Sequence, residues 1–172
     1  WDIKDISLHD IAKILGSDVP VCLLPHTPKR MQGIGDSIDP LTYQMPEMHM
    51  LLINPNIPCP TPAVYKALKL SSYTQPLNIP VTQRTEDFLG FLKNNTRNDM
   101  TEAAIGIVPE IADVLECLSE QNDCLLARLS GSGATCFGIF SNEKDCTTAS
   151  KKISAKYPQW WVQSTIVKPI VF

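Results

Sequence analysis

Residues 124–140 read CLLARLSGSGATCFGIF, and this stretch decides the fold class. Two apolar runs of strand length, Cys124–Leu129 and 134–140, flank the glycine-rich sequence SGSG at 130–133. Apolar runs of this length, bounded by turn residues, are typical of strands that lie against a core. The stretch therefore predicts two strands joined by a short turn.

The regions on both sides of this unit mix strands and helices without a regular order. Capping residues and apolar spacing predict a helix after Asn142, a last strand at 160–167 and an extended run at 48–53. Because the elements do not alternate as in βαβ units, we predict an α+β fold, a sheet with helices on one face. The other predicted elements are a helix from Ser7 to Gly16, a strand-like run at 19–24, and helices that begin near Thr61-Pro62, Thr85, Asn98 or Asp99, and Pro109.

The composition excludes several classes of protein. A chain of 172 residues with 44% apolar side chains is long enough for one compact domain, or one plus part of another. Its net charge of −3 provides no basic stripe for a nucleic acid. No apolar run approaches the roughly 20 residues that span a bilayer. We therefore expect neither a nucleic acid nor a membrane as partner, and the oligomeric state stays open.

The six cysteines predict neither a disulfide scaffold nor a metal site. None of them forms a Cys-x-x-Cys pair, and no histidine stands at zinc-finger spacing from any of them. Most lie in apolar runs, where a thiol behaves as a small hydrophobic side chain. This pattern is typical of a protein from a reducing compartment.

The first candidate site is Asp18, in the sequence GSDVP at 16–20. A carboxylate held on a turn between Gly16 and Pro20 can accept a proton from a substrate hydroxyl that lies within about 2.6–3.2 Å. Alternatively, Asp18 forms an Asx-turn by hydrogen bonding to its own backbone two residues on. Spacing alone favours the Asx-turn.

The second candidate is the loop at 130–135, with the sequence SGSGAT. Paired glycines let backbone N–H groups converge on an anion, and the hydroxyl groups add donors, so the loop could line a phosphate. It is not a Walker A loop, because no lysine follows the glycines, and it does not match the dinucleotide fingerprint. A tight hairpin needs the same glycines, so both interpretations stay open.

The third candidate is the proline-rich segment at 58–62, followed by Tyr65. Three prolines before a helix form a stiff shelf, and an aromatic ring on the first turn can stack on a flat ligand. In the structural alternative, the prolines start the helix and Tyr65 packs into the core. The nearby Gly33 and Gly35 could contact the same ligand or form a β-bulge.

Taken in order, these segments resemble the GHMP kinases, a family of small-molecule kinases. The GSDVP and SGSGAT sequences are similar to motifs of the whole family. The PTP sequence with its following aromatic is similar to the branch that acts on a cytidine diphosphate alcohol. The resemblance extends over nearly the whole chain. The segments that carry it are 15–20, 33–35, 54–55, 60–66, 98–100 and 130–137.

The resemblance implies a role for each candidate. A carboxylate would act as the base on the substrate hydroxyl, which attacks the γ-phosphate of ATP in the presence of Mg²⁺. The glycine-rich loop would line the phosphates, and the aromatic ring would stack on the cytosine of cytidine diphosphate methylerythritol. The implied residues are Asp18 as the base, Ile34, Thr61, Pro62 and Tyr65 for the substrate, and Gly131, Ser132 and Gly133 for the phosphates.

The chain departs from the family at its start. The main phosphate-binding loop of the family, of Gly-Leu-Gly-Gly-Gly-Ser-Ser type, and its catalytic lysine precede the matching segments and have no counterpart here. Because phosphoryl transfer depends on positioning and charge stabilisation, we expect the 172-residue chain alone to be inactive.

The same resemblance predicts two domains. Residues 1–46 are similar to the tail of a ribosomal-protein-S5-like, ATP-binding domain. Residues 47–172 are similar to the C-terminal domain of the family, an antiparallel sheet with helices on one face. The chain begins at Trp1 and is expected to be the later part of a cytoplasmic enzyme of isoprenoid precursor synthesis.

Two other functions stay open. A GHMP kinase for another small alcohol, of the homoserine or mevalonate type, would keep Asp18 and the glycine-rich loop but would not need a shelf for cytosine. A non-catalytic α+β binding or dimerisation module would use Gly131 and Gly133 only to turn a hairpin.

Overall fold

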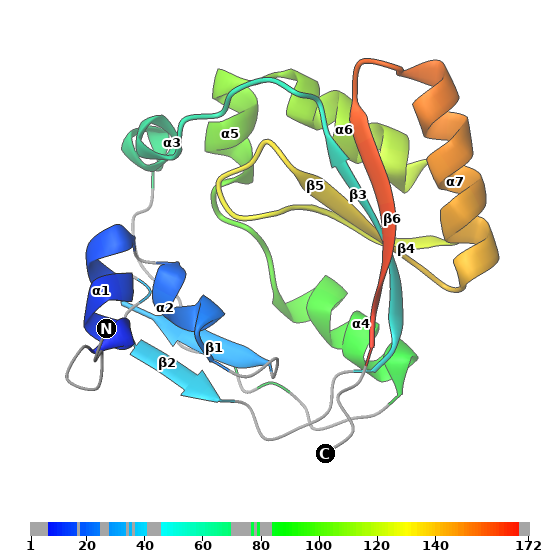
Figure 1. Ribbon diagram of the computed structural model, residues 1–172. Coiled ribbons are helices and arrows are strands. Elements are labelled where there is room, and N and C mark those ends of the chain that lie inside the picture. Colours follow the sequence, from blue (N-terminus) through cyan, green and yellow to red (C-terminus); the bar gives the residue numbers. More distant parts are fainter. Residues whose placement is uncertain are drawn as a thin grey trace, which may run out of the picture. The chain divides into compact units, whose positions relative to one another are not determined.

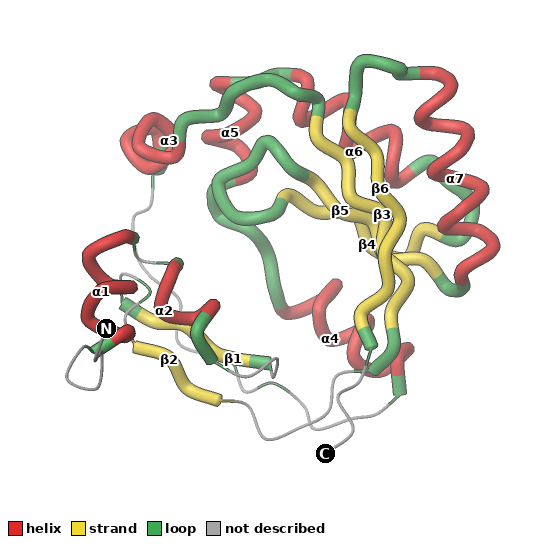
Figure 2. Tube along the Cα trace, viewed as in Figure 1, coloured by secondary structure: helices red, strands yellow, loops and turns green. Residues whose placement is uncertain are grey.

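The computed structural model describes residues 7–16, 18–24, 28–33, 35, 37–40, 46–69, 77, 79 and 84–168. The chain divides into two compact units (Figures 1 and 2). One unit comprises Trp1–Met45 with Pro169–Phe172, and the other comprises Pro46–Lys168.

The first unit begins with helix α1 (Leu8–Leu15). The Ser7 hydroxyl accepts a hydrogen bond from the Asp10 N–H at 3.2 Å, and the helix ends at Gly16, as the sequence predicts. The residues that follow form helix α2 (Val19–Cys22), so the strand-like prediction for 19–24 is wrong. Pro20 explains the difference, because its fixed φ and missing N–H suit the first turn of a helix.

A short hairpin completes the first unit. Strand β1 (Lys29–Gln32) pairs with strand β2 (Ser37–Pro40) in antiparallel orientation. Gly33 and Gly35 lie in the turn between these strands, where the Gly35 N–H donates to the Gln32 carbonyl at 3.0 Å. They therefore belong to a hairpin turn, and the alternative of a β-bulge does not apply.

The second unit is built on a four-stranded antiparallel sheet, ordered β4-β5-β3-β6. The two strands from the stretch at 124–140 pair directly with each other. The run predicted at 48–53 and the last strand, predicted at 160–167, extend the sheet beside them. The predicted α+β fold with an antiparallel sheet is confirmed. The strands are β3 (Met48–Asn54), β4 (Cys124–Leu129), β5 (Cys136–Phe140) and β6 (Trp161–Val167).

Five helices in the described part of this unit connect the strands, close to the predicted positions. The Asn142 side chain caps α7 by accepting the Asp145 N–H at 3.0 Å, and Pro109 precedes α6 directly. Three starts differ slightly from the prediction. The N-cap position is occupied by Pro60 in α3 and by Arg84 in α4, each one residue before the expected threonine, and by Met100 in α5, just after Asp99. The helices are α3 (Thr61–Ala67), α4 (Thr85–Asn95), α5 (Thr101–Ile107), α6 (Glu110–Ser119) and α7 (Glu143–Lys156).

The main core lies between the sheet and helices α6 and α7, which cover one face (Figure 1). Side chains alternate along β3, so that Leu51 and Ile53 point into this core and are fully buried. Phe140 of β5 and Ile153 of α7 pack in the same cluster. No helix in the described part of the chain is long and apolar enough to cross a membrane.

Helix α4 contacts β4 from the opposite face. Leu129 points into the main core, and Arg128, its neighbour in the strand, therefore points to the other side. The Arg128 guanidinium donates to the carbonyls of Leu92 at 3.2 Å and Thr96 at 3.0 Å, at the C-terminal end of α4. Arg128 thus ties this helix to the strand that leads into the glycine-rich loop.

Candidate functional site

The glycine-rich loop between β4 and β5 forms a tight, internally bonded turn. The Ser130 N–H donates to the Thr135 carbonyl at 2.9 Å, and the Gly133 N–H donates to the Ser130 carbonyl at 3.0 Å. Gly131 and Gly133 have φ values of +55° and +93°, a region that strongly favours glycine. The hairpin interpretation is therefore correct for the backbone, and it leaves the anion interpretation open.

The proline-rich segment meets this loop in space. The Thr61 and Ser132 hydroxyl oxygens are 2.7 Å apart, a hydrogen bond between the first residue of α3 and the middle of the loop. The Cys59 thiol donates to the Ser132 carbonyl at 3.3 Å. Burial raises the pKa of this thiol, which keeps it protonated as a donor at neutral pH. Two of the three sequence candidates thus form one site.

Tyr65 faces away from the core. Its side chain is 58% exposed, whereas the preceding Val64 is fully buried against the core. The prolines do start α3, as the structural alternative expects. Its second part, in which Tyr65 packs inside, is wrong, because Val64 occupies the inward position on this turn. Pro62 and Thr61 are also exposed, so the start of α3 presents a ring and a hydroxyl to solvent.

Two asparagines also contribute to this site, although the sequence did not identify them as site residues. The Asn98 amide donates to the carbonyls of Leu129 at 3.0 Å and Gly131 at 2.7 Å. The Asn54 amide donates to the Thr135 hydroxyl at 2.9 Å. Both asparagines lie in segments noted for their resemblance to the family, but a single sequence carries no signal for partners so distant along the chain.

The loop retains unused hydrogen-bond donors. Among the described residues, the backbone N–H groups of Gly131 and Ser132 have no hydrogen-bond partner. Adjacent N–H groups of this kind can bind an anion such as a phosphate. The described residues contain no group of three His, Cys, Asp or Glu side chains that could hold a metal ion.

Asp18 belongs to the first unit, at the start of α2. Its side chain is exposed and makes no capping hydrogen bond. The predicted Asx-turn is therefore wrong, because the residue two positions on is Pro20, which has no N–H to donate. The carboxylate is open to solvent, as proton transfer from a substrate would require. Ile34 lies outside the described residues.

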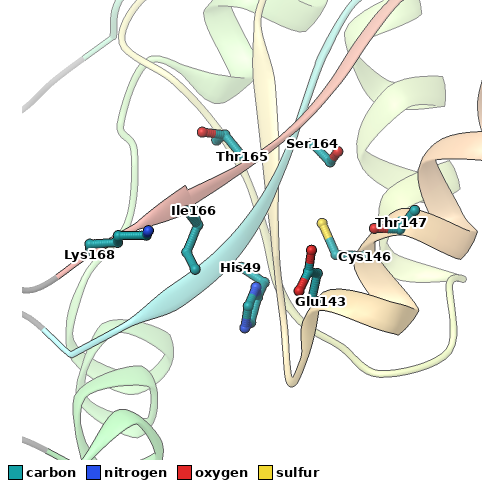
Figure 3. A pocket seen from close by; sticks show the side chains of 8 residues that line it. All are labelled: His49, Glu143, Cys146, Thr147, Ser164, Thr165, Ile166 and Lys168. Atoms are coloured by element: carbon teal, nitrogen blue, oxygen red, sulfur yellow. The ribbon is translucent and has the colours of Figure 1, made fainter.

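A separate cavity of about 350 Å³ lies between α7 and strands β3 and β6 (Figure 3). His49, with its Nε2 atom 3.9 Å from the Glu47 carboxylate, lines it from β3, and Glu143 and Cys146 line it from α7. Burial raises the pKa of Cys146 to about 11, so this thiol is not a nucleophile at neutral pH. None of the sequence-predicted site residues lines this cavity.

Comparison with known proteins identifies the family. Residues 81–159 match the model described as GHMP kinases C terminal. A 4-diphosphocytidyl-2-C-methyl-D-erythritol kinase of Cereibacter sphaeroides is 42% identical over 160 residues, which cover 91% of this chain and 57% of that protein. The chain thus spans about 57% of the length of this relative.

Solved structures agree with this comparison in fold. A crystal structure of 4-(cytidine 5'-diphospho)-2C-methyl-D-erythritol kinase superposes with a TM-score of 0.70 at 24% identity, over 93% of this chain and 57% of that one. Homoserine kinase from Cytophaga hutchinsonii superposes with a TM-score of 0.61 at 12% identity, over 96% and 59% of the respective chains. The chain belongs to the GHMP kinase family, and its residues 81–159 are a GHMP kinase C-terminal domain.

Proposed function

We propose that the chain is part of an ATP-dependent kinase that phosphorylates the 2-hydroxyl of 4-diphosphocytidyl-2-C-methyl-D-erythritol, a cytoplasmic step of non-mevalonate isoprenoid precursor synthesis. The Thr61–Ser132 hydrogen bond carries the proposal, because it joins the candidate cytosine-binding segment to the candidate phosphate loop. The names of the curated relatives support the choice of substrate.

In the proposed reaction, the Asp18 carboxylate takes the proton of the 2-hydroxyl. The hydroxyl oxygen bonds to the γ-phosphorus of ATP, the bond from that phosphorus to the β,γ-bridging oxygen breaks, and ADP leaves. The N–H groups of Gly131 and Ser132, which have no partner among the described residues, fit a role beside the phosphates. Mg²⁺ would accompany ATP and neutralise phosphate charge.

The start of α3 is proposed to bind the cytidine end of the substrate. The exposed ring of Tyr65 offers a face for stacking on cytosine, and Thr61 and Pro62 stand on the same helical turn. Ile34 is proposed for the facing wall. A small-alcohol kinase of another type would leave this exposed ring without a function.

We propose the same domain division as the resemblance implies, with an ATP-binding tail over 1–46 and a C-terminal domain over 47–172. The separation of the chain into two compact units near residue 46 supports it. The 172-residue chain alone is proposed to be inactive. Transfer of phosphate from ATP by the purified chain would contradict this.

The base assignment is tested by Asp18→Asn in the full-length gene product that contains this chain. The amide cannot accept the proton, so kcat falls by about 10²–10⁴. Asp113→Asn, on the exposed face of α6, is the matched control and keeps the wild-type rate. An unchanged rate for the Asp18 variant would favour the non-catalytic module.

The substrate assignment is tested by Tyr65→Ala beside Tyr65→Phe. Stacking on a base contributes about 1–3 kcal/mol, so the alanine variant raises KM for the cytidyl substrate by roughly 5- to 150-fold, whereas phenylalanine retains it. The KM for ATP serves as the internal control. Equal KM values in both variants would favour a kinase for homoserine, mevalonate or another small alcohol.

A further inference from the structure

Asn98 uses the amide nitrogen of its side chain to hold the glycine-rich loop. Both N–H bonds of its carboxamide nitrogen point to loop carbonyls, those of Leu129 at 3.0 Å and Gly131 at 2.7 Å. Its carboxamide oxygen accepts the Met100 N–H at 2.9 Å. A neutral amide has two donor hydrogens and one acceptor oxygen, so this arrangement engages every polar group of the side chain.

These two bonds fix the direction of loop N–H groups. In a trans peptide, the carbonyl and the following N–H point in opposite directions. A Gly131 carbonyl held on Asn98 therefore aims the Ser132 N–H away from Asn98, and this N–H has no partner among the described residues. The Leu129 carbonyl shares its peptide group with the Ser130 N–H, which bonds to Thr135 inside the turn.

The backbone around Asn98 is itself anchored. The Asn98 carbonyl accepts the Thr101 hydroxyl at 2.8 Å, at the start of α5. Two residues before it, Thr96 receives hydrogen bonds from Arg128, at 2.5 Å on its hydroxyl and 3.0 Å on its carbonyl. Arg128 lies on β4, directly before Leu129, so the donor amide and its two acceptors are tied to the same strand.

We propose that Asn98 is a positioning residue that keeps the Ser132 N–H group aimed outward for the phosphates of ATP. This rests on the proposed function, because it assigns the loop to a phosphate. Asn98 acts through the loop backbone and makes no contact of its own with ATP. Its loss therefore weakens ATP binding and leaves recognition of the alcohol unchanged.

The test is Asn98→Asp, which keeps the shape and the acceptor for Met100 but removes both donors. Asn95→Asp is the matched control, since Asn95 is exposed on α4 and donates a single bond to the Phe91 carbonyl at 3.2 Å. The first measurement is amide hydrogen exchange in the 172-residue chain. The Ser130 and Gly133 amides exchange at least roughly tenfold faster in the Asn98 variant, while the Ile139 amide in β5 keeps its rate.

The second measurement is steady-state kinetics of the full-length gene product. KM for ATP rises at least roughly tenfold in the Asn98 variant, whereas KM for the alcohol stays within about twofold and Asn95→Asp behaves as wild type.

The two measurements separate the possible failures. Unchanged exchange of the loop amides overturns the positioning role, whatever the kinetics show. Faster exchange with an unchanged KM for ATP overturns the claim that the held Ser132 N–H serves the nucleotide. A wild-type protein without kinase activity overturns the proposed function, while exchange still decides whether Asn98 holds the loop.

Discussion

Any side chain larger than hydrogen at position 133 of the loop would be strained, for two independent reasons. Its φ of +93° lies where side chains are strained, and a Cβ atom there would lie 3.1 Å from Leu129 Cδ1 and 3.2 Å from Ile111 Cδ1. The Leu129 and Ile111 side chains are buried and have little room to move. The shape of the loop is therefore constrained by the core that it packs against as well as by any ligand that it binds.

We predict that Gly133→Ala lowers the free energy of unfolding by about 1–3 kcal/mol, from backbone strain and overpacking. Gly90→Ala is the control, because no heavy atom lies within 4 Å of a Cβ built there in α4 and alanine favours the helix by up to about 1 kcal/mol. Urea unfolding followed by tryptophan fluorescence measures both. Equal effects of the two substitutions would contradict the crowding.

At the level of elements, α4 depends on one side chain of β4. Arg128 donates to two carbonyls at the C-terminal end of this helix and to the Thr96 hydroxyl. Burial lowers the pKa of Arg128, but a guanidinium is so strong a base that the group stays charged at neutral pH. Charged donors stabilise the last turn, where helix carbonyls lack partners.

We predict that Arg128→Met lowers the free energy of unfolding by about 2–4 kcal/mol, because three hydrogen bonds from a charged group are lost and the Thr96 carbonyl loses its donor. Arg97→Met removes a guanidinium that forms an exposed ion pair with the Asp99 carboxylate, and it costs less than about 1 kcal/mol. Urea unfolding distinguishes the two. A cost for Arg128 as small as that for Arg97 would contradict the anchoring of α4.

The sequence predicts those elements whose signals are local. The pair β4 and β5 follows from two apolar runs with a glycine-rich turn, and α7 follows from the Asn142 cap. Helix α2 is missed because a single turn is too short to show a period, and its β-branched residues favour a strand. Whether the proline shelf meets the loop cannot be predicted from local signals, because Thr61 and Ser132 are 71 residues apart in sequence.

For the polar side chains of the site, too, prediction succeeds where the signal is local and fails where it depends on tertiary contacts. The sequence identifies the loop, Thr61 and Tyr65 as candidates, because glycines, prolines and an aromatic ring have local meaning. It does not assign Asn98 or Asn54, because an amide can bond to any nearby polar group and its partner depends on tertiary structure. The exposure of Tyr65 is likewise set by which face of α3 Val64 occupies.

At the level of the whole molecule, the large hydrophobic cluster formed by the described residues lies in the second unit. In the described part of the first unit, only Ala12 and Pro20 are buried. Tyr157 and Trp160 stack at a centroid distance of 3.9 Å within the second unit, where they provide a spectroscopic reporter of its packing. A unit with its own core has the means to fold independently.

We predict that a chain of residues 46–168 folds alone, because it contains the complete cluster. Its near-ultraviolet circular dichroism matches that of the 172-residue chain. Its Tm lies within about 5 °C of the corresponding transition of the 172-residue chain, a shift that corresponds to roughly 1 kcal/mol in a domain of this size. Loss of the aromatic signal in the shortened chain would show that the second unit needs the first.

The place of β3 in the sheet has a consequence for biosynthesis. This apolar strand lies in the interior of the sheet, yet both of its neighbours, β5 and β6, come much later in the chain. On the ribosome, Met48–Asn54 must wait without its partners until nearly the entire unit has emerged. Nascent chains stalled before Cys136 should therefore expose this apolar segment, which should recruit chaperones. The chaperones should release the segment when the last strand emerges.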